Sequence, residues 1–590
     1  MPAPSRFRTP EEAVDFTLER VGKRVVLGTP LGLGKANHLV NAFWQRAMDD
    51  PSLDLTIYTA LTLSRPRWGS ELERRLVEPL SERLFGDYPE LAWVEPLRRG
   101  ELPGNARVRE FYLLPGFFLD SPAAQRGHTS SNYSHVVRDV LDAGLNVLAQ
   151  LVGAEEVDGA PRLSLSCNPD LTLDLVPRMR RRELRGEPVA VLAQVNRQLP
   201  FFYGDAMLPE EAFDGILDGP QWQFDLPSVP NEGIDTTDYA IALRAAALVR
   251  DGGTIQLGIG ALGDAVTWSL LLRHRENEAY RRALAALGGD GEQQAAFARV
   301  GGTGPFAEGL FAASEMLVDG FLELYKAGIL RREVDDGTIA HSCFFLGPRS
   351  FYRRLRELPR QERQRFRMTS ISWVNELHGD EEIKRRQRRH ARFLNTGLKA
   401  TLLGAVASDG LEDGRLISGV GGQYNFVAMA HALDDGRSVL MVRSAREADG
   451  EVTSNVVWSY GHATIPRHLR DLLVTEYGVA DLRGRTDEEV AAAMVEVADS
   501  RFQEELVRAA KEAGKLPRGY RLPEHARGNL PERLEQALAP LRQQGHLPRL
   551  PFGTDLSEEE VVLVGALRAL RRKVAAREVK AGDFEHLKEA

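Results

Sequence analysis

Short runs of β-branched and aliphatic residues alternate with longer helical patterns along most of this chain, and that alternation restricts the possible folds more than any other feature. Helices that connect parallel strands are the expected result of such an order. The sequence therefore predicts an α/β protein built on open parallel sheets. The expected strands are Arg24–Gly28, Leu55–Leu61, Val189–Val195, Thr254–Leu257, Ser438–Arg443 and Leu472–Thr475.

A polar, proline-bearing stretch at residues 218–238 separates two regions with this alternation and predicts a linker. We place a domain boundary near Pro230. The first α/β domain then covers residues 1–229, and the second covers residues 230–516. Charged helical periodicity inside the second domain indicates a helical insertion at about residues 273–303.

Residues 517–590 follow both domains and are expected to form an extended arm and a terminal amphipathic helix. Prolines recur in the arm, where no strand pattern is found. Ser557–Glu560 matches an S-x-x-E capping box, which marks the start of the helix. We expect this helix to dock on its own or a neighbouring subunit through one apolar face. That face carries Leu563, Leu567, Leu570 and Val574.

The composition argues against several classes of function. Lys and Arg number 75 against 84 Asp and Glu, so the formal net charge is −9, which does not favour a general nucleic-acid partner. No apolar stretch reaches about 20 residues, and Met1–Glu12 lacks the apolar segment of a secretion signal. Cys167 and Cys343 are too few for a disulfide framework or a cysteine-rich metal site. We expect a cytoplasmic protein without metal, in which both cysteines are packing residues.

Three glycine-rich loops follow expected strands and precede expected helices, an arrangement that directs backbone N–H groups toward an anion. The first loop, Gly28–Lys35, superficially suggests a phosphate-binding loop. However, Thr29 stands where a Walker A motif needs glycine, and Ala36 stands where it needs serine or threonine. We therefore do not expect this loop to bind a nucleoside triphosphate.

The second loop, Gly258–Gly263, matches the pattern G-x-G-x-x-G. On its own it is compatible with a dinucleotide site, a tight strand-to-helix turn or the site of another ligand. A dinucleotide site also needs a strand that ends in an acidic residue about 20 positions later, whereas Glu276 and Glu278 lie in a charged helical segment. The third loop, Ser418–Gln423, could equally be a simple turn.

A basic run, Lys384–Arg392, holds six Lys or Arg in nine positions directly after the acidic residues 380–382. Mixed charge of this kind is typical of a solvated helix face. Contact with a phosphate group is the alternative interpretation.

Five phrases occur in a fixed order along the chain. They are Ala193–Asn196 with Gly204 and Asp205, Ile255–Leu262 with Asp264–Val266, Ser314–Met316 with Asp319 and Gly320, Ser418–Gly422, and Val474–Gly484. Together they resemble the acetyl-CoA hydrolase/transferase family, a branch of the family I CoA-transferases that includes acetate and 4-hydroxybutyrate CoA-transferases. The resemblance runs from about Gly22 to about Leu516 and covers neither the insertion nor the tail.

This resemblance implies two related open-sheet domains, with helices on both faces of each sheet and the active site between the domains. It implies that Glu315, which stands before an M-x-x-D-G segment, is the catalytic nucleophile and forms a glutamyl-CoA thioester. Glu476, in a T-E-Y-G segment, is either a supporting catalytic group or a buried structural carboxylate. Asn375 and Gly421 are possible supporting residues.

The resemblance also implies that coenzyme A is a substrate and that no cofactor is held permanently. The second loop corresponds to the family's CoA-binding loop, and further CoA contacts follow it in the chain. The implied CoA-binding residues are Gly258, Ile259, Gly260, Ala261, Leu262, Ser418, Gly422 and Arg446.

The implied activity is transfer of CoA between short acyl groups, such as acetyl, and short carboxylic acids, by a homodimer or higher homo-oligomer. The alternatives are an acyl-CoA hydrolase, a dinucleotide-binding oxidoreductase and a non-catalytic CoA-binding protein. The chain departs from the family pattern at Gly263, often proline in the family, at Val442–Arg446, in place of L-P-S-T-A, and at Gln423–Phe426. These departures leave the acyl specificity open.

Overall fold

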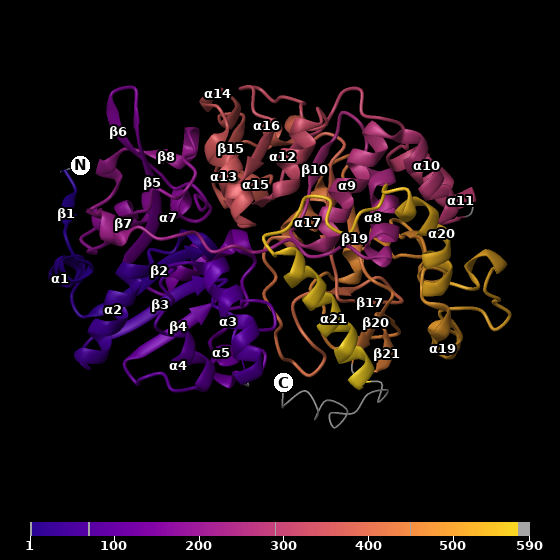
Figure 1. The fold of residues 1–590 in the computed structure, drawn as a ribbon, viewed down its shortest axis with the longest axis horizontal. Coiled ribbons are helices and arrows are strands. Elements are labelled where there is room, and N and C mark those ends of the chain that lie inside the picture. The colour runs from indigo at the N-terminus through magenta and orange to yellow at the C-terminus, as the bar shows by residue number, and fades with distance from the viewer. Residues whose placement is uncertain (1–2, 69–70, 290, 449, 576–590) are drawn as a thin grey trace.

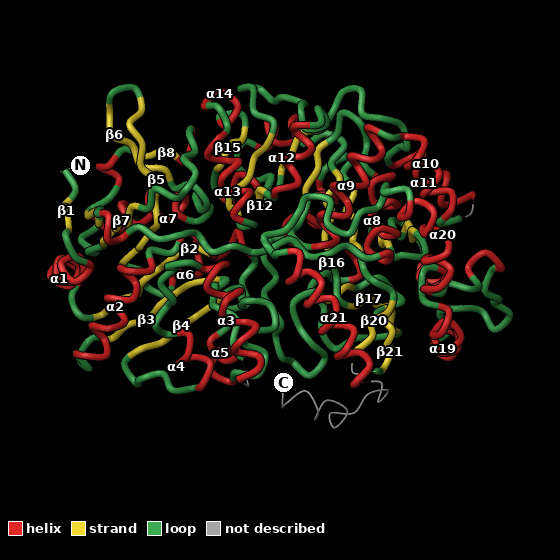
Figure 2. Tube along the Cα trace, in the orientation of Figure 1, coloured by secondary structure: helices red, strands yellow, loops and turns green. Residues whose placement is uncertain are grey.

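Two large sheets dominate the computed structural model, which describes residues 3–68, 71–289, 291–448 and 450–575 (Figure 1). One sheet is built from the first 217 residues and the other from residues 254–481. Helices surround both sheets, as the red segments of Figure 2 show. The α/β class with open parallel sheets is therefore confirmed. Within the described residues, none of the helices is both long and apolar enough to cross a membrane.

The first sheet has seven parallel strands in one path, and a short antiparallel extension, β6 with β8, joins it at β5. Its path follows the order β1, β9, β7, β5, β2, β3, β4. Their bounds are β1 Ser5–Phe7, β2 Arg24–Leu31, β3 Asp54–Ala60, β4 Ala106–Glu110, β5 Val147–Val157, β6 Ala160–Ser164, β7 Ala190–Val195, β8 Met207–Leu208 and β9 Gly215–Leu217. The helices around it are α1 Pro10–Val21, α2 Asn37–Asp49, α3 Glu71–Phe85, α4 Val94–Arg99, α5 Pro122–Gly127, α6 Val136–Asp142 and α7 Thr172–Glu183.

The second sheet has eight strands, all parallel except the last, in the order β15, β13, β11, β10, β16, β19, β23, β24. Their bounds are β10 Thr254–Gln256, β11 Phe311–Ala313, β13 Ala340–Ser342, β15 Phe366–Met368, β16 Arg392–Thr396, β19 Arg437–Met441, β23 Leu472–Val474 and β24 Val479–Asp481. Short strands form three small sheets beside it. They are β12 Met316–Leu317 with β14 Phe344–Phe345, β17 Lys399–Thr401 with β18 Val406–Ala407 and β22 Val456–Val457, and β20 Ala445–Ala448 with β21 Glu451–Ser454.

Helices of the second half connect these strands and continue into the tail. Their bounds are α8 Thr236–Leu248, α9 Ala261–Arg275, α10 Asn277–Ala286, α11 Gly291–Val300, α12 Asp319–Lys326, α13 Arg349–Glu357, α14 Arg360–Arg363, α15 Ile371–Asn375, α16 Glu381–Gln387, α17 Gln423–Ala432, α18 Asp487–Glu496, α19 Ser500–Glu512, α20 Pro531–Gln543 and α21 Glu558–Ala575.

All six predicted strands are present, as β2, β3, β7, β10, β19 and β23, with ends that differ by at most three residues. The end of α9, α10 and α11 lie within the predicted helical segment at about residues 273–303, and its being an insertion stays a prediction. Cys167 and Cys343 are both buried free thiols, which confirms their role as packing residues. The boundary near Pro230 stays a prediction; α8 begins just after it, at a capping box formed by Asp235 and Asp238.

The tail is more structured than the predicted extended arm, because it contains the helix α20. Leu534, Leu538 and Leu541 of that helix are buried, and α20 packs against α8 and α10. The capping box at Ser557–Glu560 is confirmed, since Glu560 accepts a hydrogen bond from the Ser557 N–H at 2.7 Å and its own N–H donates to Ser557 Oγ at 3.2 Å. The side chains of Leu570 and Val574 lie outside the described residues. Those of Leu563 and Leu567 are 38% and 42% exposed.

The segment before α21 bridges the two halves of the molecule. Asp555 accepts hydrogen bonds from the backbone N–H of Arg349, at 2.7 Å, and from the hydroxyl of Ser228. Arg83 of α3 donates to the Asp555 carbonyl oxygen and pairs with Glu560. Arg349 is the first residue of α13, so the Asp555 carboxylate caps that helix from a distant part of the chain.

We expect Asp555→Ala to lower the free energy of unfolding by about 1–2 kcal/mol, because it removes a helix cap and leaves two donors without an acceptor. Thermal unfolding measures the change. Asp555→Asn retains an acceptor and should lose less, and Glu558→Ala, at an exposed neighbouring position, should lose nothing. Equal melting temperatures for Asp555→Ala and the wild type would show that the bridge does not stabilise the fold.

Candidate active site

Glu315 lies where the chain leaves the carboxyl end of β11 and enters β12. The preceding residue, Ser314, donates its N–H to the His341 carbonyl oxygen at 3.0 Å. The Glu315 carbonyl oxygen in turn accepts the N–H groups of Cys343 and Phe344, at 3.0 and 3.1 Å. Backbone hydrogen bonds on both sides therefore fix the position of Glu315.

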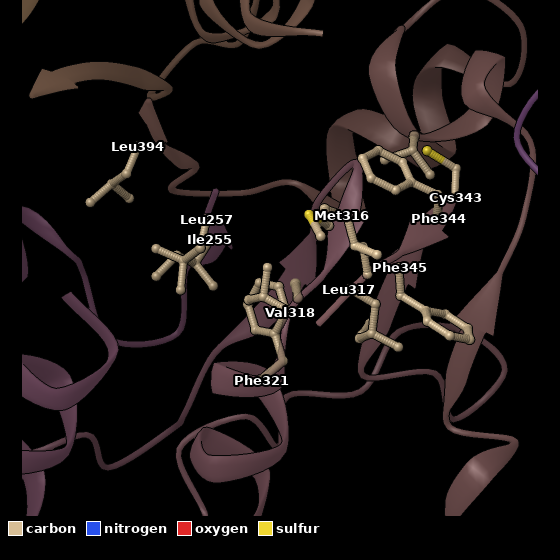
Figure 3. Packing of buried hydrophobic residues seen from close by; sticks show 14 of the residues in the cluster. Ile255, Leu257, Met316, Leu317, Val318, Phe321, Cys343, Phe344, Phe345 and Leu394 are labelled. Carbon is tan, nitrogen blue, oxygen red and sulfur yellow. The ribbon is translucent and has the colours of Figure 1, made fainter. Parts of the chain in front are cut away.

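Hydrophobic packing beneath this turn holds the β12 backbone in place. Met316 and Leu317 of β12 lie beside Phe344 and Phe345 of β14, and Val318 and Phe321 pack next to them (Figure 3). All these side chains are at most 7% exposed. Glu315 is itself partly exposed, so its carboxylate lies at the edge of this core and not within it.

The Glu315 carboxylate accepts a hydrogen bond from the Asn375 side-chain amide, with 2.6 Å between Nδ2 and Oε2. Burial raises the pKa of Glu315 to about 7, and the nearby charge of Asp170 raises it as well, while the Asn375 hydrogen bond opposes the shift. A carboxyl group with this pKa exchanges its proton near neutral pH and is ionised in a large fraction of molecules there.

The third glycine-rich loop lies directly against this carboxylate. A Cβ atom added at Gly422 would overlap Glu315 Oε2 and Asn375 Nδ2, so only glycine fits at this position. Gly421, with φ of 54°, adopts the left-handed backbone conformation, and a Cβ there would lie 3.7 Å from Glu315 Oε1. Helix α17 begins at Gln423, so its positive N-terminal end starts beside the carboxylate.

Asn375 is the last residue of α15, and buried cations fix the end of that helix. Lys384 Nζ donates to the carbonyl oxygen of Ser372 at 3.1 Å. Arg388 donates to the carbonyl oxygens of Trp373 and of Glu376, the latter at 3.0 Å. These bonds hold the backbone on both sides of Asn375 and so position its amide toward Glu315.

The prediction that Lys384–Arg392 forms a solvated helix face holds for only part of the run. Arg385, Arg386 and Arg389 form ion pairs at the surface, and the other three cations are buried. Lys384, Arg388 and Arg392 are only 2%, 1% and 3% exposed. Arg392 donates to the carbonyl oxygens of Leu248, Val300, Ala391 and Asp435. These three side chains are buried because each finds backbone carbonyl oxygens as partners, and charge pattern alone cannot reveal such partners.

The second loop lies next to Glu315 because β10 and β11 are neighbouring parallel strands. The Ser314 hydroxyl donates to the carbonyl oxygen of Leu257, at 3.1 Å, just before the loop begins. Gly258 and Ile259 are exposed, the latter to 51%. The loop therefore begins with an exposed backbone segment next to Ser314, the residue that precedes Glu315.

Two glycines of this loop are required by its shape. Gly260, with φ of 106°, precedes the first turn of α9, which starts at Ala261 and continues through Leu262. A Cβ atom at Gly263 would overlap the carbonyl oxygen of Gly258, which explains why this chain has glycine there. Glu276 and Glu278 lie at the junction of α9 and α10 and not at a strand end, so the structure lacks the acidic strand end that a dinucleotide site requires at that spacing.

The N-terminal half contributes two tyrosines that the sequence patterns did not indicate. The ring of Tyr112 packs against Gly421, and the backbone of Tyr112 packs against Gly419. Tyr133 donates its N–H to the Gly421 carbonyl oxygen at 3.1 Å and its hydroxyl to Asp170. Burial and the charge of Glu315 both raise the pKa of Tyr112. The candidate site therefore lies where the two halves meet, as the resemblance implied.

Of the other predicted site residues, Ser418 lies near the site, whereas Arg446 and Glu476 make no hydrogen bond or ion pair to Glu315 among the described residues. Ser418 is buried and interacts with Tyr112, which lines the site. Arg446 lies on the exposed β20–β21 hairpin, and no contact among the described residues links it to Glu315. Glu476 is 4% exposed and accepts hydrogen bonds from the N–H and hydroxyl of Ser444, at 2.9 and 2.6 Å. This geometry favours the buried structural role for Glu476 over the supporting catalytic one.

We expect Asn375→Leu to move the pH dependence of kcat/KM to higher pH. The wild-type value should rise with pH through a midpoint near pH 7 and level off about one unit higher, because the Glu315 carboxyl group must lose its proton to act as a nucleophile. Loss of one hydrogen bond to the charged form should raise its pKa by about one unit. Asn277→Leu, remote from the site, should leave the profile unchanged. A midpoint for Asn375→Leu that is unmoved or lower would contradict this role.

Comparison with known protein families gives a match over part of the chain. Residues 347–510 match the family model described as the acetyl-CoA hydrolase/transferase C-terminal domain. This segment includes Asn375, Gly421 and Gly422 and ends before the tail, and the match confirms the resemblance drawn from the sequence motifs.

Several curated relatives are CoA transferases. The chain is 28% identical to 4-hydroxybutyrate coenzyme A transferase of Clostridium kluyveri over 332 residues, which are 54% of this chain and 64% of that relative. It is 24% identical to succinyl-CoA:cyclohexane-1-carboxylate CoA transferase of Geobacter metallireducens over 452 residues, 71% of this chain and 88% of that relative. The alignment with the first of these thus spans less than two thirds of its length.

Solved structures share the fold. RipA from Yersinia pestis aligns with a TM-score of 0.60 at 21% identity over 87% of this chain and 98% of that structure. A 4-hydroxybutyrate CoA-transferase from Porphyromonas gingivalis aligns with a TM-score of 0.57 at 19% identity over 86% of this chain and 98% of that structure.

Proposed function

Because residues 347–510 of this chain match the family model described as the acetyl-CoA hydrolase/transferase C-terminal domain, we propose that the protein is an acyl-CoA:carboxylate CoA-transferase with Glu315 as its nucleophile. The observation that carries this proposal is the place of the Glu315 carboxylate. It lies against Gly421 and Gly422 at the start of α17 and accepts a hydrogen bond from the Asn375 amide, with a pKa of about 7.

The proposed reaction has two halves that mirror each other. The Glu315 carboxylate attacks the thioester carbon of the acyl-CoA, the carbon–sulfur bond breaks, and an acyl-glutamyl anhydride and CoA thiolate result. The thiolate then attacks the glutamyl carbonyl carbon, which releases the first carboxylate and leaves a glutamyl-CoA thioester. A second carboxylate reverses both steps and leaves as the new acyl-CoA. Protons and electrons balance without a further reactant.

Two features of the site suit this chemistry. Each tetrahedral intermediate carries an oxyanion. The candidate donors are backbone N–H groups at the starts of α17 and of α9, which have no side-chain cap among the described residues. Asn375 can hold one carboxylate oxygen while the other attacks, because its amide bonds only Oε2. One such donor typically contributes about 10²-fold or more in rate.

Short acyl groups are the proposed substrates, in line with the names of the relatives, which include transferases of butyrate and of acetate. The cytoplasmic location and the homo-oligomer stay predictions. Hydrolysis is the nearest alternative, since water can resolve the same glutamyl-CoA thioester, and the family description includes hydrolases.

A panel of acyl-CoA and isotope-labelled carboxylate pairs, analysed by mass spectrometry, tests the proposal. We expect labelled acyl-CoA to appear with little net release of free thiol. Fast thiol release that a second carboxylate does not change would identify a hydrolase instead. Tight CoA binding without turnover would identify a non-catalytic CoA-binding protein. Saturable NAD(P) binding that CoA does not displace would favour an oxidoreductase.

A further inference from the structure

A cavity of about 370 Å³ lies at the edge of the second sheet, away from Glu315. Its walls come from the end of α10, from α11, the turn after β23, helix α18 and the beginning of α20. Figure 1 shows α20 beside α10 and α11 on the side of the second sheet opposite the first. The insertion and the tail therefore meet here, and both lie outside the resemblance. The volume falls within the range of about 300–1,000 Å³ that is typical of small-molecule sites.

Two guanidinium groups in the wall have only carbonyl oxygens as partners among the described residues. Arg244 is 1% exposed and donates to the carbonyl oxygens of Glu476 and Leu287, at 2.8 and 3.0 Å. Its Nε atom is buried and has no acceptor among the described residues. Arg533 donates to the carbonyl oxygens of Arg527 and Gly528, both at 3.1 Å. Among the described residues, neither cation has a carboxylate at ion-pair distance. Burial lowers the pKa of Arg244 to about 10, and the nearby charge of Glu476 opposes that shift.

The carboxylates of the same wall are already engaged. Asp481 pairs with Arg299 at 2.6 Å and with Arg437 at 2.5 Å. Glu489 accepts the Thr486 N–H at 2.8 Å and so caps α18. Glu496 lies 3.4 Å from His525. The three acids of the wall therefore have partners of their own, and among the described residues none of them pairs with Arg244 or Arg533.

An apolar surface completes the wall. Leu287, Val497 and Leu534 line it together with small residues, including Ala493 of α18. We propose that this cavity binds a small organic anion, whose carboxylate or phosphate pairs with Arg244 and Arg533 and whose apolar part packs on these residues. Arg244 also donates to the backbone of Glu476 and Tyr477, so an anion bound there is linked to the T-E-Y-G segment.

Thermal shift and calorimetry on the full-length protein test this site with citrate, butyrate, adenosine monophosphate and inorganic phosphate at constant ionic strength. At least one organic anion should raise the melting temperature by several degrees, more than inorganic phosphate does. Comparison of the carboxylates, citrate and butyrate, with adenosine monophosphate shows whether the site prefers a carboxylate or a phosphate group. The site would be disproved if no anion in the panel stabilised the protein at millimolar concentration.

Substitutions in the cavity test whether the anion binds there and not at the candidate active site. Arg533→Ala should weaken anion binding by about tenfold or more, because it removes a charge-assisted contact. Ala493→Phe should abolish binding by filling the space. Arg508→Ala, an exposed position on α19 outside the cavity, should bind normally. If both Arg533→Ala and Ala493→Phe bound the anion as tightly as the wild type does, the assignment would be overturned. A crystal of the wild-type protein soaked with the anion that binds most tightly tests the location directly, since electron density for the anion should appear in the cavity.

Discussion

Glu315→Gln should lose at least about 10³-fold in kcat for CoA transfer, with little change in CoA affinity or melting temperature. The amide keeps the size of the side chain and its place beside Asn375, but it cannot attack a thioester as a carboxylate does. Initial rates of acyl exchange, CoA affinity by calorimetry and thermal unfolding together measure the effect.

Two further variants act as controls for this substitution. Glu315→Asp keeps the charge but withdraws the attacking oxygen by over about 1 Å, and misplacement of that size can cost about 10²-fold. Glu476→Gln removes the other predicted carboxylate, which is bonded to Ser444, and should keep transfer through Glu315 even if it turns over slowly. Near-normal turnover by Glu315→Gln would contradict the assignment of the nucleophile.

Gly422→Val should lower kcat/KM by at least about 10²-fold, because its side chain needs the space that the Glu315 carboxylate and the Asn375 amide now occupy. The overlap should also cost about 1–3 kcal/mol of stability. Gly422→Ala should show the same loss of activity, since the Cβ atom alone already overlaps both groups. Steady-state kinetics and thermal unfolding separate the two effects.

Gly519→Val is the matched control, because a Cβ atom there has no other heavy atom within 4 Å. It should keep both activity and melting temperature. If Gly422→Ala retained normal kinetics, the loop would be a simple turn, and the close contact with Glu315 would have no part in the reaction.

The strands that the sequence predicted share one property. Each is a run rich in β-branched and aliphatic residues bounded by polar or glycine residues, as at β2 and β19. The sequence of the strand itself therefore predicts that it is buried on both faces of the sheet. The missed strands β11, Phe311–Ala313, and β13, Ala340–Ser342, contain no β-branched residue, and their pairing depends on neighbours distant in sequence. Local pattern could not identify them.

The candidate site was predictable only where a motif marks it. Glu315 and Gly422 were found through family phrases, and the structure brings them together with Asn375. Tyr112 and Tyr133 belong to no such phrase and reach the site through contacts between the two halves of the chain. The buried cations of the 384–392 run were misread because their partners are carbonyl oxygens, which carry no sequence signal.

Helix α20 was missed for a related reason. Its sequence begins with Pro531 and contains Pro540, and repeated prolines are typical of an extended arm. Proline is nevertheless well tolerated in the first turn of a helix. The three buried leucines of α20 pack on helices of the second half, and this tertiary burial offsets the unfavourable interior Pro540.

The most direct test of the proposed mechanism is mass spectrometry of the peptide containing residues 311–319 after incubation with acyl-CoA. We expect this peptide to gain the mass of coenzyme A less one water, on Glu315. Borohydride should trap the thioester by reduction, and a carboxylate added before the reductant should prevent the trapping. Glu315→Gln should show no adduct. An adduct on Glu476, or full transfer activity without any adduct on Glu315, would contradict the account.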